Sequence, residues 1–230
     1  MSEATWLPLE SNPDVLNKFM AQMGVSPLWN IVDIYGMDDE LLGMVPAPLK
    51  SLIFLFPVSN AYEEFRAKED EELKAKNLQH PKDLFYMRQY IHNACGTIAL
   101  LHAILNNPDI EIEKGSTIYN FRESAKDATP EERGKLLLND AGISGAHETI
   151  ATEGQTAAPD INEKVYHHFI AFVHFGGKLY ELDGRKNFPI EHGNTTPETL
   201  LKDAVAVCKQ YIARDPNEVR FTLMGLAPAQ

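Results

Sequence analysis

The chain lacks the features that would tie it together with disulfides or place it in a membrane. It contains only two cysteines, Cys95 and Cys208, which are too few for a disulfide framework. Its first residues have neither the basic head nor the apolar run of a signal peptide, and no stretch approaches the length of a membrane span. We therefore expect a soluble cytoplasmic protein with reduced thiols and no membrane partner.

Basic charge is scarce as well. The chain has 21 Lys and Arg against 33 Asp and Glu, a formal net charge of -12. This balance argues against nucleic acid as a partner and favours a basic macromolecule attracted over long range, although an acidic surface can also serve solubility alone. His92 precedes Cys95 by three residues, but no second Cys or His pair completes a zinc spacing. We expect no metal and no cofactor.

Length and apolar content fit one domain spanning residues 1–230. The 230 residues are 44% hydrophobic, enough for one sizeable core, and show no internal repeats. The patterns predict an α/β protein. The expected helices cover residues 13–23, 61–76, a segment that starts after Asn93 and ends at residue 105, and residues 121–125, 130–138 and 195–213, with a brief helical turn over 38–42. The expected strands cover residues 31–34, 50–57, 167–175, 178–183 and 219–224. The helix over 61–76 is highly charged, and we expect it to serve solubility.

The most informative stretch runs from Gln89 to Thr97 and leads directly into an apolar segment, residues 98–105. The pattern predicts a thiol, Cys95, in the first turn of a buried helix. We expect Asn93 to cap that helix by accepting a hydrogen bond from a backbone N–H. The positive helix terminus favours a thiolate, which predicts a lowered pKa for Cys95.

A predicted hairpin supplies a base and an orienting group. With Gly176-Gly177 as its two-residue turn, Phe175 faces Lys178 and Asp183 stands opposite Ile170. Because strand side chains alternate faces, His168 and Asp183 point to the same face as diagonal neighbours, about 7 to 8 Å apart between backbones. Such a pair alone also fits a structural hydrogen bond.

Together with Cys95, the pair fits nucleophilic catalysis: a thiol, an imidazole that takes its proton, and a carboxylate that orients the ring. Gln89 could place its amide beside the backbone N–H of Cys95 as an oxyanion hole, the alternative being a solvent-facing amide. Residues 142–162 are rich in Gly, Ala and Thr. We interpret them as a long surface loop, either a lid or a disordered segment, and favour the lid.

Several motifs resemble one enzyme family, in that family's order and over nearly the whole chain. They cover residues 6–13, 33–38, 93–97, 153–156, 168–171, 179–186 and 214–216. On these segments the sequence resembles the ubiquitin carboxyl-terminal hydrolases of the small single-domain type, without a departure at a catalytic position.

The resemblance implies a fold and roles for individual residues. The fold is a papain-like cysteine hydrolase core, with a central antiparallel sheet of about six strands flanked by helices on both sides and a knotted chain path. The implied roles are Cys95 as nucleophile, His168 as base and then acid, Asp183 as orienting group and Gln89 as oxyanion donor. Residues 147–166 resemble the active-site crossover loop of the family. The implied contacts to the basic C-terminal tail of ubiquitin are Pro8, Leu9, Glu10, Asp14 and Asp33.

The implied activity is hydrolysis of esters, thioesters, amides or short peptide extensions after the C-terminal glycine of ubiquitin, through an acyl-enzyme. We expect a monomer whose partner is ubiquitin, and a ubiquitin-like protein stays open as a second substrate. Two alternatives remain: a ubiquitin-binding module with weak or gated activity, and a papain-like amidase or acyltransferase acting on another small substrate.

Overall fold

The computed structural model describes residues 4–75, 80–155 and 165–230. The described helices are α1 (Pro13–Met23), α2 (Asp39–Leu42), α3 (Asn60–Ala75), α4 (Cys95–Leu105), α5 (Thr117–Ala125), α6 (Pro130–Leu138), α7 (Ala141–Ala151) and α8 (Leu200–Ala213). The described strands are β1 (Trp29–Asp33), β2 (Ser51–Pro57), β3 (His167–Phe175), β4 (Lys178–Leu182), β5 (Ile190–Asn194) and β6 (Thr222–Pro228). No helix among these residues is long and apolar enough to cross a membrane.

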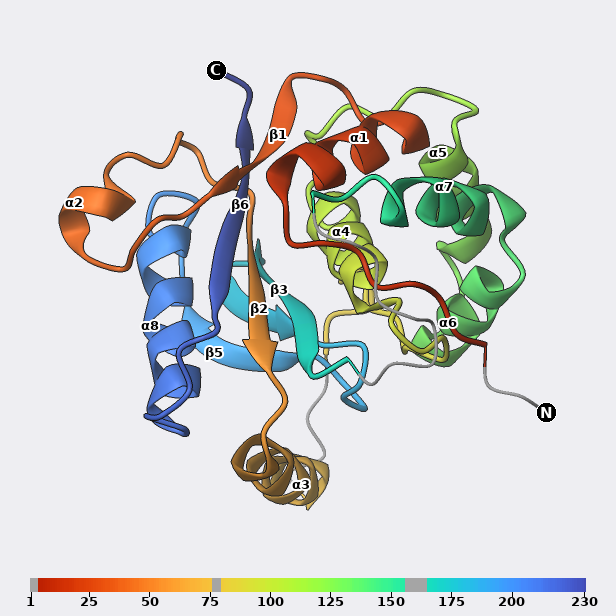
Figure 1. Cartoon of the computed structure of the whole chain (residues 1–230). Helices are drawn as coiled ribbons and strands as arrows, with labels where there is room; N and C mark the ends of the chain where they lie inside the picture. The colour runs from red at the N-terminus through yellow and green to blue at the C-terminus, as the bar shows by residue number, and fades with distance from the viewer. Residues whose placement is uncertain (1–3, 76–79, 156–164) are drawn as a thin grey trace.

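The strands form one antiparallel sheet in the order β1-β6-β2-β3-β4-β5. β2 lies at its centre between β6 and β3, and six of its seven residues are buried. This burial on both faces explains why the sequence of β2 is continuously apolar. Figure 1 shows α8 on one side of the sheet and α1, α4, α5, α6 and α7 on the other. An antiparallel sheet of six strands with helices on both sides is confirmed, and the knotted chain path stays a prediction.

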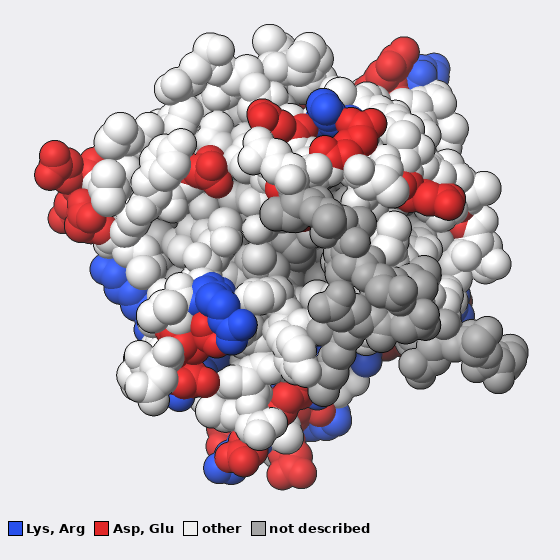
Figure 2. Space-filling model, viewed as in Figure 1, with Lys and Arg blue, Asp and Glu red and all other residues white. Residues whose placement is uncertain are grey.

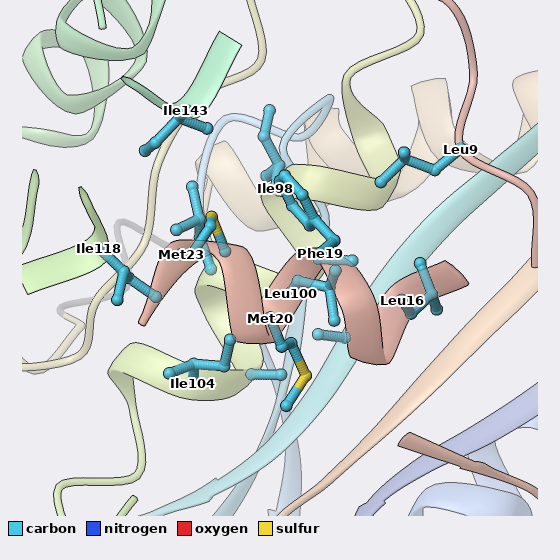
Figure 3. Close-up of a cluster of buried hydrophobic side chains, with 14 of the residues drawn as sticks. Leu9, Leu16, Phe19, Met20, Met23, Ile98, Leu100, Ile104, Ile118 and Ile143 are labelled. Atoms are coloured by element: carbon cyan, nitrogen blue, oxygen red, sulfur yellow. The ribbon is translucent and has the colours of Figure 1, made fainter. Parts of the chain in front are cut away.

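The larger core lies on the side of α4. This helix is buried from Cys95 to Ile104, because it lies between β2 and β3 on one side and a layer of helices on the other. Figure 3 shows α1 crossing α4, with Phe19, Met20 and Met23 of α1 beside Ile98 and Ile104. The core thus fixes the helix whose first residue is Cys95.

α1 forms as its sequence predicts. Asn12 accepts from the N–H of Asp14 (3.0 Å), Pro13 occupies the first turn, and Gly24 ends the helix with a φ of 95°. Its apolar stripe faces the core described above.

The second core lies on the side of α8. Phe54 and Phe56 of β2 pack there against Tyr211 of α8 and Tyr62 of α3. Cys208 is fully buried in this cluster.

The predicted loop over residues 142–162 was wrong in its first part, because Ala141–Ala151 forms α7. Asp140 caps this helix through the N–H of Ile143 (2.8 Å), and Ile143, His147 and Ile150 are buried at helical spacing. Small residues between them hid that periodicity. The proposed crossover segment, residues 147–166, therefore begins inside a helix, and its residues 156–164 lie outside the described residues.

Two strands differ from expectation at the C-terminal end of the chain. β6 runs from Thr222 to Pro228 instead of 219–224, because it pairs with β1 and β2 while Val219 is exposed. β5 was not predicted, since Ile190 is its one buried residue and its sequence carries little strand signal.

Candidate active site

Cys95 is the first residue of α4, as predicted, but the helix is not capped by Asn93. The N-cap is Ala94, which makes no side-chain hydrogen bond. Asn93 has a left-handed backbone, with a φ of 63°, and its side-chain N–H donates to the carbonyl oxygen of Trp6 (3.1 Å). A capping residue needs an extended backbone, so this conformation excludes the predicted role. Cys95 still lies in the first turn, where backbone N–H groups have no partner within the helix.

The hairpin has the predicted register. Phe175 pairs with Lys178 and Ala171 with Leu182, so His168 and Asp183 meet on one face. His168 Nε2 lies 2.6 Å from Asp183 Oδ1, and both side chains are buried. The aspartate is the acceptor, so Nε2 carries the proton. His168 is also hydrogen-bonded to Cys95, which leaves Nδ1 as the ring nitrogen that serves the thiol.

The charges in this chain favour a thiolate beside an imidazolium. Burial opposes ionisation of Cys95, but the hydrogen bond and charge of His168 and the N–H of Phe169 outweigh it and lower the pKa of the thiol. Burial likewise works against charged His168, but Asp183 and Cys95 raise its pKa to about 9. Asp183 is fully buried, yet His168, the Lys186 charge and the Arg185 N–H (2.9 Å) hold its pKa well below the usual range.

Gln89 is half-buried and lines the same cavity as Cys95. The cavity has a volume of about 540 Å³ and is also lined by Cys95, His168 and Arg185. The backbone N–H of Gln89 donates to Gly184 (2.8 Å), and its side-chain Nε2 donates to Ile91 (3.0 Å). One Nε2 hydrogen is thus occupied, and the second can serve another acceptor.

A second cavity, of about 230 Å³, reaches Cys95 from the opposite side. Its walls include Pro8, Leu9 and Glu10 from the extended N-terminal arm (residues 4–12), together with Leu55 and Phe169. Cys95 therefore stands where two cavities meet. The predicted contact residues Pro8 and Leu9 line the same cavity as Cys95.

An acidic opening lies beyond the smaller cavity. Glu10, Asp14 and Asp33 line it together with Gln155. Burial, with the charge of Asp14, raises the pKa of Asp33. Figure 2 shows acidic side chains gathered over α1 and the neighbouring end of β1 on this face. The structure thus brings all three predicted acidic residues together at one end of the path to Cys95.

Sequence reasoning missed Tyr62 and Tyr86. The Tyr62 hydroxyl donates to Asp183 Oδ2 (3.1 Å), and the Tyr86 hydroxyl lies 2.7 Å from the Asp183 carbonyl oxygen. The signal for Tyr62 was weak, because it is one of two aromatic residues in a highly charged helix. The interpretation of α3 as a purely solubilising helix was therefore incomplete.

His147 of α7 was also missed. Its Nε2 donates to the Leu7 carbonyl oxygen (2.6 Å), which leaves Nδ1 to accept from the Thr97 hydroxyl (2.8 Å). The imidazole thereby ties the arm to α4 two residues beyond Cys95. Burial lowers its pKa to about 4, so the ring is neutral at pH 7.

The described residues contain no group of three or more His, Cys, Asp or Glu that could hold a metal ion. The arrangement of Cys95, His168 and Asp183 can instead perform nucleophilic chemistry with protein groups alone.

Comparisons with known proteins identify the family. The family described as ubiquitin carboxyl-terminal hydrolase, family 1, matches residues 6–213. A ubiquitin carboxyl-terminal hydrolase of Drosophila melanogaster is 53% identical over 226 residues, which cover 98% of this chain and 99% of that protein. Human ubiquitin carboxyl-terminal hydrolase isozyme L1 is 43% identical over 223 residues, covering 96% of this chain and 98% of the human protein.

A solved structure shows the same fold. The catalytic domain of Trichinella spiralis UCH37, crystallised with ubiquitin vinyl methyl ester, matches with a TM-score of 0.76 at 24% identity, covering 100% of this chain and 98% of that one. This likeness confirms the papain-like fold that the sequence implied. With the family match across residues 6–213 and relatives similar over their full length, the chain belongs to family 1 of the ubiquitin carboxyl-terminal hydrolases.

Proposed function

We propose that this chain is a deubiquitinating cysteine hydrolase that cleaves ester, thioester, amide or short peptide bonds after the C-terminal glycine of ubiquitin. The observation that carries the proposal is the buried hydrogen-bonded series from Asp183 through His168 to Cys95, placed where two cavities meet. We further propose that residues 1–230 act as one catalytic domain and as a monomer.

The first half of the reaction forms an acyl-enzyme. His168 Nδ1 takes the thiol proton, Asp183 stabilises the imidazolium, and Cys95 Sγ attacks the carbonyl carbon of the terminal glycine. The negative oxygen that develops accepts from the Cys95 N–H at the start of α4 and from the free amide hydrogen of Gln89. The tetrahedral species then collapses to a thioester, and His168 returns its proton to the leaving group.

The second half releases ubiquitin. His168, now neutral, removes a proton from water, which attacks the thioester carbonyl through a second oxyanion. The carbon–sulfur bond breaks, Cys95 leaves as the thiolate beside protonated His168, and the new carboxylic acid releases its proton to solvent. The site returns to its starting state without a cofactor.

The surface between the arm and α1 supports ubiquitin as the substrate. A basic tail would approach through the acidic opening at Glu10, Asp14 and Asp33, then pass Pro8 and Leu9 in the smaller cavity to reach Cys95. The larger cavity on the other side of the thiol would receive the leaving group. Because the net charge is -12, long-range attraction of a basic tail favours the same partner. A ubiquitin-like protein with a basic tail would fit by the same chemistry.

The test uses a ubiquitin C-terminal ester and a ubiquitin carrying a C-terminal electrophile. Cys95→Ala should abolish ester turnover and labelling while keeping ubiquitin binding. Cys208→Ala is the matched control, because this second buried thiol lies in the core on the α8 side of the sheet; it should keep both turnover and labelling. Turnover by Cys95→Ala would refute the mechanism. A wild-type chain that binds ubiquitin without turnover would be a binding module, and one that neither binds nor is labelled would act on another substrate.

A further inference from the structure

The carboxylate of Asp183 is held from two sides. On one side, Oδ1 accepts from His168 Nε2 (2.6 Å) and from the backbone N–H of Arg185 (2.9 Å). On the other side, Oδ2 accepts from the hydroxyl of Tyr62 on α3 (3.1 Å). Among the described residues, the hydrogen bond to Oδ2 comes from Tyr62 alone. Asp183 is fully buried and Tyr62 is 4% exposed, so water does not readily replace this donor.

We propose that Tyr62 is a positioning residue for the hydrolysis: its hydroxyl holds the Asp183 carboxylate in the rotation at which Oδ1 meets His168. This inference rests on the function proposed for Cys95, His168 and Asp183.

The geometry explains why a second donor matters. The torsion that turns a carboxylate about its Cβ–Cγ bond is broad, so contacts at one oxygen leave the plane free to rock. A donor at the opposite oxygen removes that freedom. Since the carboxylate fixes the imidazole through Nε2, rotation of Asp183 would turn Nδ1 of His168 away from the Cys95 thiol. A buried oxygen left without a donor would also carry a desolvation cost.

Tyr62 is itself well placed to act as a fixed donor. Its ring packs edge-on against Phe56 at 4.8 Å between centroids, and Phe56 packs edge-on against the His168 ring at 5.8 Å. Burial and the charge of Asp183 raise the pKa of Tyr62 well above its ordinary value. The hydroxyl therefore stays protonated at working pH and donates to the carboxylate.

Further polar contacts anchor α3 to the turn that follows Asp183. Glu63 pairs with Arg185 (2.6 Å), and Glu69 pairs with Lys186 (2.5 Å). Asp70 accepts from the side-chain amide of Asn187 at 2.7 and 2.8 Å. The contacts from residues 62, 63, 69 and 70 repeat after seven residues, so one face of this charged helix is turned to the 183–187 segment. This face keeps the Tyr62 hydroxyl opposite Asp183.

The test compares Tyr62→Phe with Tyr211→Phe. Both changes remove one hydroxyl from a buried tyrosine that donates to a buried carboxylate. The carboxylate differs, because Tyr211 donates to Glu181 (2.7 Å), and Glu181 does not contact His168 or Cys95 in the described structure. Four quantities are measured for each variant: kcat and KM with a ubiquitin C-terminal ester, the pH dependence of Cys95 alkylation by iodoacetamide, and the melting temperature.

We expect Tyr62→Phe to lower kcat roughly tenfold, the size of one lost hydrogen bond to a charged group, with KM unchanged. The acid limb of the alkylation profile should shift to higher pH, because a loosely held carboxylate stabilises the imidazolium, and hence the thiolate, less well. The other groups that surround Asp183 stay in this variant. They are His168 of β3, Cys95 and His102 of α4, Glu181 of β4, Tyr211 of α8, Tyr86, and the turn residues Arg185 and Lys186. Tyr211→Phe should keep kcat and the alkylation profile within about twofold.

Two outcomes would overturn the inference. In the first, Tyr62→Phe lowers the melting temperature while kcat and alkylation match the wild type, which would make the hydroxyl purely structural. In the second, Tyr211→Phe costs as much kcat as Tyr62→Phe, which would mean that the loss of any buried hydroxyl on this side of the sheet lowers the rate. Failure of the proposed function looks different, since Cys95→Ala would then retain turnover whatever Tyr62→Phe does.

Discussion

Gln89 is fixed beside Cys95 through both its backbone and its side chain. Its N–H reaches Gly184, the residue after Asp183, and its Nε2 reaches Ile91. Gly184 allows this close approach, because a Cβ at that position would lie 3.1 Å from the Cβ of Gln89. The amide is therefore held in place before any substrate arrives, which is the condition for a donor that stabilises charge only as it develops.

Replacing Gln89 by Ala should lower kcat about 100-fold and leave KM nearly unchanged. The reason is that a missing oxyanion donor costs roughly 10² to 10³ in kcat, while the ground-state carbonyl is bound by other contacts. Steady-state kinetics on a ubiquitin C-terminal ester would measure kcat and KM separately. Gln22→Ala, at an exposed position of α1, is the matched control and should keep both constants. An unchanged kcat in Gln89→Ala would assign the oxyanion hole to other donors.

At the scale of the element, α7 links the fold to the path that we propose for the substrate tail. It packs against α1, holds the arm through His147, and its last residue, Ala151, lines the smaller cavity. Gly154 follows closely, where an added Cβ would lie 2.2 Å from the Glu10 carboxylate. The helix thus aligns one wall of the approach to Cys95 with the acidic opening.

Removing the cap of α7 should weaken the fold without touching the chemistry. Asp140→Ala deletes the acceptor for the N–H of Ile143, and such caps contribute about 1 kcal/mol. Urea unfolding should show that loss, while the alkylation rate of Cys95 stays at the wild-type value. Asp127→Ala, at an exposed position in the turn after α5, is the control and should be neutral within about 0.5 kcal/mol. A stability equal to wild type for Asp140→Ala would mean that packing alone holds α7.

Local patterns predicted the central parts of the site. The turn at Gly176-Gly177 set the hairpin register, and strand alternation then placed His168 and Asp183 on one face. Sequence patterns also predicted the helix at α1 and the strand at β2. Each of these features depends on residues that are close in sequence.

Features that depend on distant contacts were not predictable from one sequence. Asn93 has a left-handed backbone, and its side chain donates to the carbonyl oxygen of Trp6, which is 87 residues away in the sequence. Tyr62 and Asp183 lie 121 residues apart, and no local pattern relates them. α7 was missed for another reason. Gly142, Gly145 and other small residues separate its apolar residues, so the helical spacing is weak in the sequence, and the helix is stabilised by packing against α1.

At the scale of the whole molecule, the helical layer on the α4 side contains two histidines that are neutral in the folded protein. Burial lowers the pKa of His102 to about 3 and that of His147 to about 4. Both rings are used as neutral hydrogen-bonding groups, His102 accepting from the N–H of Met87 (3.1 Å) and His147 bridging Leu7 and Thr97. Protonating either ring therefore opposes this packing.

Because these two histidines are buried and neutral, we expect the free energy of unfolding to fall as the pH is lowered from neutral to mildly acidic values. The folded pKa of His147 lies below its unfolded value of about 6.5, so its contribution is complete above pH 6.5 and is lost as the pH falls toward 4. Between pH 7 and 5.5 this amounts to about 1 kcal/mol for each of the two histidines. His168 behaves in the opposite sense: its pKa is raised to about 9, so its contribution is present below pH 6.5 and is lost as the pH rises through 9.

His147→Gln should therefore flatten the acid loss of stability. Glutamine keeps a donor and an acceptor but cannot titrate, so the decline in unfolding free energy between pH 7 and 5.5 should shrink by about 1 kcal/mol. Urea unfolding at pH 7, 6.25 and 5.5 would measure it, with Gln22→Ala, at an exposed position of α1, as the control that keeps the wild-type slope. His147→Gln should also start from a lower stability at pH 7, since an amide does not fill the space of the ring, which packs at a tilt against Trp6 with 4.4 Å between ring centroids. A slope equal to that of the wild type would show that His147 takes up its proton within the folded state, and the acid sensitivity would then belong to His102.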